Sequence, residues 1–168
     1  PACQTANPEN TAALCSDIDE DRETATLCRY HLAQALSAEG YYQAALTEYD
    51  GFERTAAAVW NAPARLELAA LLRSTQGKAG EDRSKVLENL GRSGEAADAL
   101  APVVAAEPTN VERGKRYARL LSLAGRFDEA LIAARQVPAE DADFVEFLFD
   151  LHKRAGHPER IIDDLRVR

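Results

Sequence analysis

One short phrase recurs along the chain at a regular spacing, and this repetition constrains the fold more than any other feature of the sequence. In each copy a glycine stands five residues before a small or aliphatic residue. The four pairs are Gly40 with Ala45, Gly91 with Ala96, Gly125 with Ala130, and Gly156 with Ile161. The second and third copies are 34 residues apart, which is the length of one helix-turn-helix unit in a class of helical repeat proteins. The spacing therefore predicts a chain built from repeated helix pairs.

The residues of the phrase explain why two helices would meet there. Glycine tolerates a positive φ angle, so it can end the first helix and reverse the chain without a steric cost. The small residue that follows allows the second helix to approach the first closely. A single helix pair cannot bury its apolar face alone, so successive pairs must stack. Because no alternating run of valine, isoleucine or threonine indicates a strand, we expect an all-α fold.

The repeated units resemble those of the tetratricopeptide repeat (TPR) family. Residues match family positions as follows: Leu32, Ala33, Ala45 and Tyr49 in the unit at 26–59; Gly91, Ala96 and Pro108 in the unit at 77–110; and Tyr117, Ala118, Ala130 and Ala134 in the unit at 111–138. A fourth unit begins near Ala142. The resemblance implies a right-handed solenoid of antiparallel helix pairs that binds a segment of another protein.

The spacing changes between the first two copies of the phrase. Gly40 and Gly91 are 51 residues apart, or one and a half repeats, which predicts one extra helix. We place it after Asn61, with Pro63 in its first turn, since asparagine favours the position before a helix and proline its first turn. The polar, glycine-containing run 76–82 is then expected to be a surface loop. The resulting TPR-like repeat domain at 20–168 has about four repeats plus one extra helix and follows a tether or short helix at 1–19.

Charge and motifs exclude several classes of function. The chain has 28 acidic and 20 basic residues and a net charge of −8, which argues against nucleic acid or an anionic membrane as the partner. No apolar run approaches the ~18 residues that a membrane-spanning helix needs. His152 and His157 are five residues apart, so they do not share a helical face that could hold a metal. Because no phosphate-binding glycine-rich loop is found either, we expect no enzyme activity, metal or cofactor.

The resemblance implies a concave groove, lined by the first helix of each pair, as the partner-binding surface. The residues at the family's groove positions are Tyr30, Gln34, Ser37, Lys115, Arg119, Ser122, Glu146, Asp150 and Lys153. Lys115 and Arg119 are one helical turn apart, an arrangement that suits a partner segment bearing carboxylates. The alternative is that both side chains pair with surface Glu and Asp of the chain itself.

All three cysteines, Cys3, Cys15 and Cys28, lie within the first 28 residues. One interpretation is an exported protein in which a disulfide between Cys15 and Cys28 joins the N-terminal segment to the first repeat helix. Cys3, which a polar run follows, resembles the lipid-carrying cysteine of a mature bacterial lipoprotein. The alternative is a cytosolic protein with three reduced cysteines, two of them packed as small apolar residues.

These patterns together favour a non-catalytic protein–protein adaptor that helps to assemble a bacterial envelope complex, such as a pilus or a secretion system. The alanine-rich and arginine-rich composition resembles that of proteins from GC-rich bacteria, and the cysteine placement indicates a periplasmic or outer-membrane-anchored protein. One alternative is a cytoplasmic TPR adaptor or secretion chaperone. Another is the recognition domain of a larger enzyme, which a chain that begins at Pro1 rather than at methionine would allow.

Overall fold

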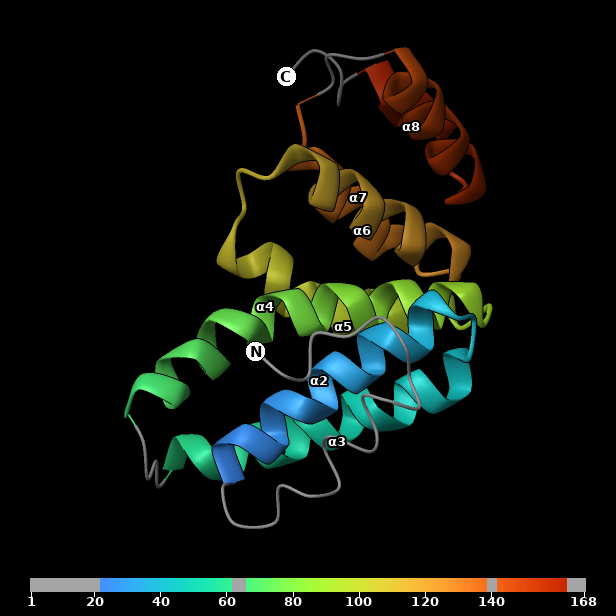
Figure 1. The fold of residues 1–168 in the computed structure, drawn as a ribbon. Helices are drawn as coiled ribbons and strands as arrows, with labels where there is room; N and C mark the ends of the chain where they lie inside the picture. Colours follow the sequence, from blue (N-terminus) through green and yellow to red (C-terminus); the bar gives the residue numbers. More distant parts are fainter. Residues whose placement is uncertain (1–21, 62–65, 139–141, 163–168) are drawn as a thin grey trace. The chain divides into compact units, whose positions relative to one another are not determined.

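The computed structural model describes residues 22–61, 66–138 and 142–162. Within these ranges all of the regular structure is helical (Figure 1). The elements are α2 (Arg22–Ala38), α3 (Tyr42–Asn61), α4 (Leu66–Asn89), α5 (Ser93–Ala106), α6 (Val111–Leu123), α7 (Phe127–Arg135), α8 (Ala142–Arg154) and the short 3-10 helix η1 (Pro158–Arg160). None of the helices in these ranges is both long and apolar enough to cross a membrane. The expected all-α class is confirmed.

Each copy of the repeated phrase forms a turn that follows a helix. Its four glycines, Gly40, Gly91, Gly125 and Gly156, have φ angles of 82°, 73°, 77° and 80°. The turn at Gly125 shows the hydrogen bonds that such a residue permits. The Gly125 amide donates to the Ser122 carbonyl at 3.1 Å, and the Arg126 amide donates to the Leu121 carbonyl at 2.9 Å. These two bonds form a Schellman motif, which satisfies carbonyl groups left over at the end of α6.

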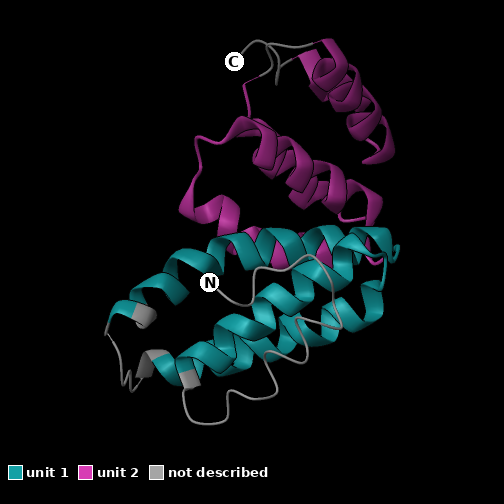
Figure 2. Cartoon of the chain, in the orientation of Figure 1, with its two compact units in different colours: residues 1–91 teal, residues 92–168 magenta. Residues whose placement is uncertain are grey.

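The described helices fall into two compact units, one within residues 1–91 and the other within residues 92–168 (Figure 2). In unit 1, α2 packs along α3, and α4 contacts both. Aromatic side chains fill this core. The ring centroid of Tyr30 lies 5.6 Å from that of Phe52 and 6.2 Å from that of Tyr49. Ala33 and Ala45 are fully buried, because small residues let the two helices approach closely.

Helix α4 departs most from the sequence-based expectation, because it runs without a break for 24 residues. The prediction of a surface loop at 76–82 is wrong. The half repeat, which was expected to form a separate extra helix, is instead part of the long helix α4. Leu72, Thr75 and Ala79 are buried at helical spacing across this stretch. A glycine such as Gly77 costs a helix about 1 kcal/mol relative to alanine, which is less than the ~1.5–3 kcal/mol gained by burying one leucine. Tertiary packing therefore outweighs the local loop signal.

Unit 2 contains α5, α6, α7, α8 and η1. Its helices pack in chain order, α5 on α6, α6 on α7 and α7 on α8. Ala118 of α6 and Ala130 of α7 are fully buried at the crossing of these helices, and Phe144, Leu148 and Leu151 bury one face of α8. The helices predicted at 95–106, 111–124, 127–137 and 142–155 are therefore present, with ends that differ by a few residues. Of the final helix predicted to run from Pro158 to Arg168, η1 and the helical residues Ile161 and Ile162 are described.

The N-terminal predictions lie outside the described residues. These predictions are the tether or short helix at 1–19 and the roles of Cys3 and Cys15. Cys28, by contrast, lies on α2 and is buried. The predicted disulfide between Cys28 and Cys15 stays a prediction.

Candidate functional site

Six of the predicted groove residues lie on two helices of unit 2. Helix α6 begins where the side chain of Asn110 accepts a hydrogen bond from the Arg113 amide at 3.2 Å, which caps the helix N-terminus. The α6 residues Lys115, Arg119 and Ser122 are spaced four and then three positions apart, so they share one helical face. The other three residues, Glu146, Asp150 and Lys153, lie exposed on α8.

The two α6 cations lie over aromatic rings of α8. The Nζ atom of Lys115 is 5.8 Å from the ring centroid of Phe144, and the Cζ atom of Arg119 is 5.9 Å from that of Phe147. The two rings are themselves 5.6 Å apart. Cations at this distance are attracted by the electron-rich ring face, typically by about 0.5–1 kcal/mol at exposed sites. We call Lys115, Arg119, Phe144 and Phe147, with the three exposed residues of α8, the α6–α8 face.

The two cations differ in their other contacts. The Nζ atom of Lys115 lies 3.3 Å from a carboxylate oxygen of Glu112, and only 13% of the lysine side chain is exposed. Arg119 is exposed, and in the described part of the chain no carboxylate pairs with it. The alternative of internal ion pairing therefore fits Lys115 but not Arg119.

Ser122 lies in the core rather than on the surface. It is buried, and its hydroxyl accepts a hydrogen bond from Nη1 of Arg154 at 3.3 Å. The guanidinium of Arg154 also lies 5.1 Å from the ring centroid of Phe127 and 3.9 Å from a carboxylate oxygen of Asp150. Arg154, which the sequence reasoning missed, therefore ties the end of α8 to α6 and to the start of α7.

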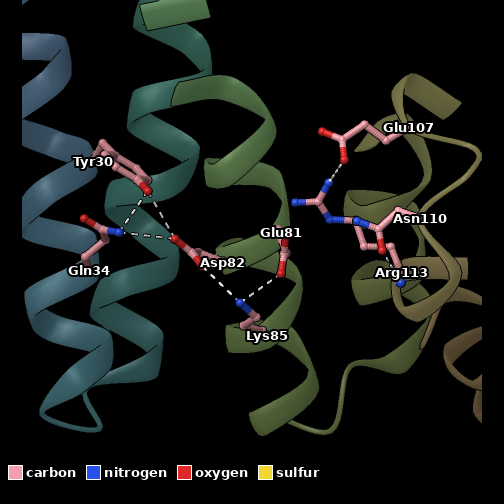
Figure 3. A network of polar contacts seen from close by, with 8 residues as sticks. All are labelled: Tyr30, Gln34, Glu81, Asp82, Lys85, Glu107, Asn110 and Arg113. Atoms are coloured by element: carbon pink, nitrogen blue, oxygen red, sulfur yellow. Dashed lines mark hydrogen bonds and ion pairs between the residues drawn. The ribbon is translucent and has the colours of Figure 1, made fainter. Parts of the chain in front are cut away.

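The remaining predicted groove residues belong to unit 1, where Tyr30 and Gln34 connect α2 to α4. Tyr30 is buried, and its hydroxyl donates a hydrogen bond to Oδ2 of Asp82 at 3.2 Å (Figure 3). Gln34 is exposed and donates to the Tyr30 hydroxyl at 2.8 Å and to the same Asp82 oxygen at 3.3 Å. Lys85 holds Asp82 from the other side, with 3.4 Å between Nζ and Oδ1. Ser37, the third predicted residue, is half-buried.

Burial shifts the pKa values of two side chains on α2, Tyr30 and His31. It raises the pKa of the Tyr30 phenol above its ordinary value, and the negative charge of Asp82 raises it further. Burial also lowers the pKa of His31, which lies beside Gln34. Both groups are therefore neutral near neutral pH, and the cluster presents a protonated phenol and an amide. The sequence reasoning missed Asp82 because it falls within the predicted loop.

Neither unit assembles a metal centre in the ranges that the structure describes. No group of three or more His, Cys, Asp or Glu side chains there is arranged to hold a metal ion. The two histidines considered in the sequence lie in different environments, because His152 is buried on α8 whereas His157 follows the turn after it. The α6–α8 face presents an exposed guanidinium, a lysine and two exposed carboxylates.

Comparison with known proteins connects this geometry to a family. The family model described as tetratricopeptide repeat matches residues 90–148, which span the turn before α5 through most of α8. This region consists of tetratricopeptide repeats. No curated protein sequence matches the chain significantly.

Two solved structures share the TPR fold with this chain. MamA of Desulfovibrio magneticus RS-1, from residue 41 to its end, is 17% identical, has a TM-score of 0.63, and matches over 95% of this chain and 80% of its own. The MamA RS-1 ArsTM double mutant is also 17% identical, with a TM-score of 0.64 and coverage of 95% and 79%. At this identity the likeness establishes the fold alone. TPR repeats support a protein–protein interaction scaffold and are typically non-catalytic, and their match confirms the resemblance drawn from the repeated phrase.

Proposed function

We propose that the chain is a non-catalytic adaptor whose α6–α8 face binds an acidic segment of a partner protein. One observation carries this proposal. Arg119 is exposed, lies over the ring of Phe147, and has no carboxylate partner among the described residues. A planar guanidinium can donate two parallel hydrogen bonds to one carboxylate. The face therefore has an open position for a partner's Glu, Asp or C-terminal carboxylate.

The neighbouring rings add to the suitability of this face. An arginine that rests on an aromatic ring loses less side-chain entropy when it binds a carboxylate than a freely rotating one. Lys115 adds positive charge one turn away, although Glu112 offsets part of it. The exposed Glu146 and Asp150 on α8 restrict where a second acidic group could lie, because like charges repel. We expect the acidic group of the partner to lie toward α6.

A peptide-binding measurement tests the α6–α8 face. The probe is a fluorescein-labelled hexaglutamate peptide, with hexaglutamine as its neutral counterpart, followed by fluorescence anisotropy. Arg119→Gln is expected to weaken hexaglutamate binding about tenfold or more, since a hydrogen bond to a charged group contributes about 1.5–3 kcal/mol. Phe147→Leu, which keeps the charge and removes the ring, should cause a smaller loss.

Arg135→Gln is the matched control, because Arg135 is also exposed but lies on α7. It changes the net charge by the same amount and should leave binding almost unchanged. Equal losses for Arg119→Gln and Arg135→Gln would show that the peptide responds only to overall charge, and the assignment of this face would be wrong.

We further propose that the adaptor works in a bacterial envelope, in the periplasm or anchored to the outer membrane through Cys3, and helps to assemble a pilus or secretion complex. The grouping of all three cysteines within the first 28 residues supports export. So does the position of Cys28, buried on the first described helix, where a disulfide would join the N-terminal segment to the repeats.

The test is the intact mass of the natively expressed, full-length protein, measured before and after reduction and alkylation. We expect a diacylglyceryl increment on Cys3 and a mass lower by two hydrogens before reduction. Three cysteines that alkylate without reduction, and no lipid, would contradict the envelope location and favour a cytoplasmic adaptor.

A further inference from the structure

Unit 2 contains a cavity of about 540 Å³ between the end of α5, the start of α6 and the last turns of α7. This volume lies within the range typical of ligand-binding pockets, about 300–1,000 Å³. Most of its lining is apolar and includes Val104, Val111, Ile132, Val137 and Pro138. The sequence reasoning missed this cavity because its walls come from three separate elements.

A glycine lets two walls of the cavity come together. Gly114 of α6 is buried, and a Cβ atom at this position would lie only 2.7 Å from Cγ2 of Val137. Any larger residue would require the Val137 side chain, or the segment that carries it, to shift. The close approach thus depends on a residue without a side chain, and both Gly114 and Val137 line the cavity.

The cavity has one charged residue in its lining, Glu129. Nε and Nη2 of Arg126 donate hydrogen bonds to the two oxygens of Glu129 at 2.8 and 2.6 Å. These bonds lower the pKa of Glu129, so the carboxylate is ionised at neutral pH. Nη1 of Arg126 also donates to Asp98 at 2.6 Å. One guanidinium therefore serves two carboxylates, and the triad carries a net negative charge beside an apolar cavity.

The cavity is separate from the α6–α8 face. On α6, the lining residues Val111, Gly114 and Tyr117 are spaced three apart. Val111 lies one turn before Lys115 on the same side of the helix, whereas Gly114 and Tyr117 lie about 100–160° around the helix axis from Lys115 and Arg119. At the outer wall on α7, Ile132 is 58% exposed. An aliphatic side chain so exposed beside an apolar cavity is available to a partner.

We propose that this cavity receives a large aliphatic or aromatic side chain from a protein segment in which a lysine or arginine stands next to that anchor. The inference rests on the proposed adaptor function and deepens it by adding a second binding site with the opposite charge preference. The apolar lining favours the anchor, and the unneutralised carboxylate charge favours the adjacent cation. The same charge disfavours fatty acids and other anionic apolar ligands, whose carboxylates it would repel.

The experiment uses the complete chain and three labelled peptides of equal length, which have Leu-Arg, Ala-Arg or Leu-citrulline at their centre. Citrulline keeps the shape of arginine and removes its charge. Binding is measured by fluorescence anisotropy and located by amide chemical shifts in NMR spectra. The Leu-Arg peptide should shift the amides of Gly114, Ile132 and Val137 saturably. Replacing the leucine by alanine should weaken binding about tenfold or more, as expected for loss of an apolar anchor.

Two matched variants test the cavity itself. Ile132 and Ile162 are 58% and 57% exposed, and only Ile132 lines the cavity. Ile132→Asn should weaken binding of the Leu-Arg peptide about tenfold. Ile162→Asn should leave the affinity for this peptide unchanged. Glu129→Gln should remove the preference for arginine over citrulline. Equal losses of affinity in the two isoleucine variants would overturn the proposal, and so would amide chemical-shift changes distributed over the whole chain. Decanoate that shifts the same amides and binds more tightly than the peptide would also overturn it.

The two proposed sites can fail separately. Arg119→Gln should weaken binding of hexaglutamate and leave the affinity for the Leu-Arg peptide unchanged. Ile132→Asn should weaken binding of the Leu-Arg peptide and leave the affinity for hexaglutamate unchanged. Loss of Leu-Arg binding with Arg119→Gln would show that both peptides use the α6–α8 face, and the cavity would not be a binding site.

Discussion

Tyr30 and Tyr49 are buried phenols whose ionisation is linked to folding. Burial raises the pKa of both side chains above its ordinary value, and the nearby carboxylate of Asp82 raises each further. Unfolding exposes the two phenols, whose pKa then returns to about 10. Their contribution to stability is therefore fully present below about pH 10 and is lost as the pH rises above this value, because only the unfolded chain releases the protons there.

We predict an alkaline loss of stability that depends on these residues. The urea midpoint should stay level between about pH 7 and 9 and fall above about pH 10. In Tyr30→Phe the fall should be shallower, with a loss of about 1 kcal/mol near neutral pH from the missing hydrogen bonds. Tyr41 is 61% exposed, so the urea midpoint of Tyr41→Phe should equal that of the unchanged protein at every pH. Tyrosinate absorbance gives an independent reading, and two phenols titrating normally in the folded chain would contradict the linkage.

At the scale of the element, the ends of the helices depend on backbone conformation more than on contacts. Gly125 has a φ angle of 77°, and a Cβ atom added to it would have no neighbour within 4 Å. A Cβ atom added to Gly77, within α4, would also have no neighbour within 4 Å. The two glycines differ only in that one ends a helix in the left-handed region and the other continues a helix. The same substitution at both positions therefore isolates the backbone effect.

We predict opposite signs for these two substitutions. Gly125→Ala should destabilise the chain by about 1–2 kcal/mol, the cost of the left-handed conformation for a residue with a Cβ atom. Gly77→Ala should stabilise it by up to about 1 kcal/mol, because alanine loses less backbone entropy in a helix. Urea unfolding monitored by circular dichroism measures both. If both substitutions stabilise the chain, the turn does not require a positive φ angle.

At the scale of the whole molecule, the described helices form two compact units, each with its own packing contacts. In repeat proteins each repeat contacts the repeats next to it in the sequence. The free energy of unfolding is therefore roughly a sum of contributions from single repeats and from the interfaces between neighbouring repeats. The described helices follow this rule in unit 2, where α5, α6, α7 and α8 pack in chain order. A loss of packing in one helix should thus affect its neighbours first.

We predict that Leu148→Ala destabilises unit 2 selectively. Leu148 is buried on α8, and truncating a buried leucine to alanine typically costs about 2–5 kcal/mol. Hydrogen exchange should accelerate in α7 and α8 and stay unchanged in α2 and α3. Phe149→Ala, at the adjacent position that is 55% exposed, is the control and should alter exchange little. A uniform acceleration over both units would show that the chain unfolds as one cooperative body.

The sequence alone determined the features that depend on neighbouring residues. A glycine that must adopt a positive φ angle reverses the chain whatever surrounds it, so the turns at Gly40, Gly91, Gly125 and Gly156 and the TPR class could be predicted. Helical spacing likewise placed Lys115 and Arg119 on one face of α6, as the structure confirms.

Tertiary structure decided whatever depends on residues distant in the sequence. The loop prediction at 76–82 failed because packing against α2 and α3 stabilises the helix through that stretch, which no local signal records. The same limit hid the rings of Phe144 and Phe147 beneath the two cations and the cavity whose walls come from α5, α6 and α7. The positive φ angle of a turn glycine is specified within a few residues, whereas the helical course of residues 76–82, burial, the pairing of charges and the shape of a cavity arise only when separate helices meet.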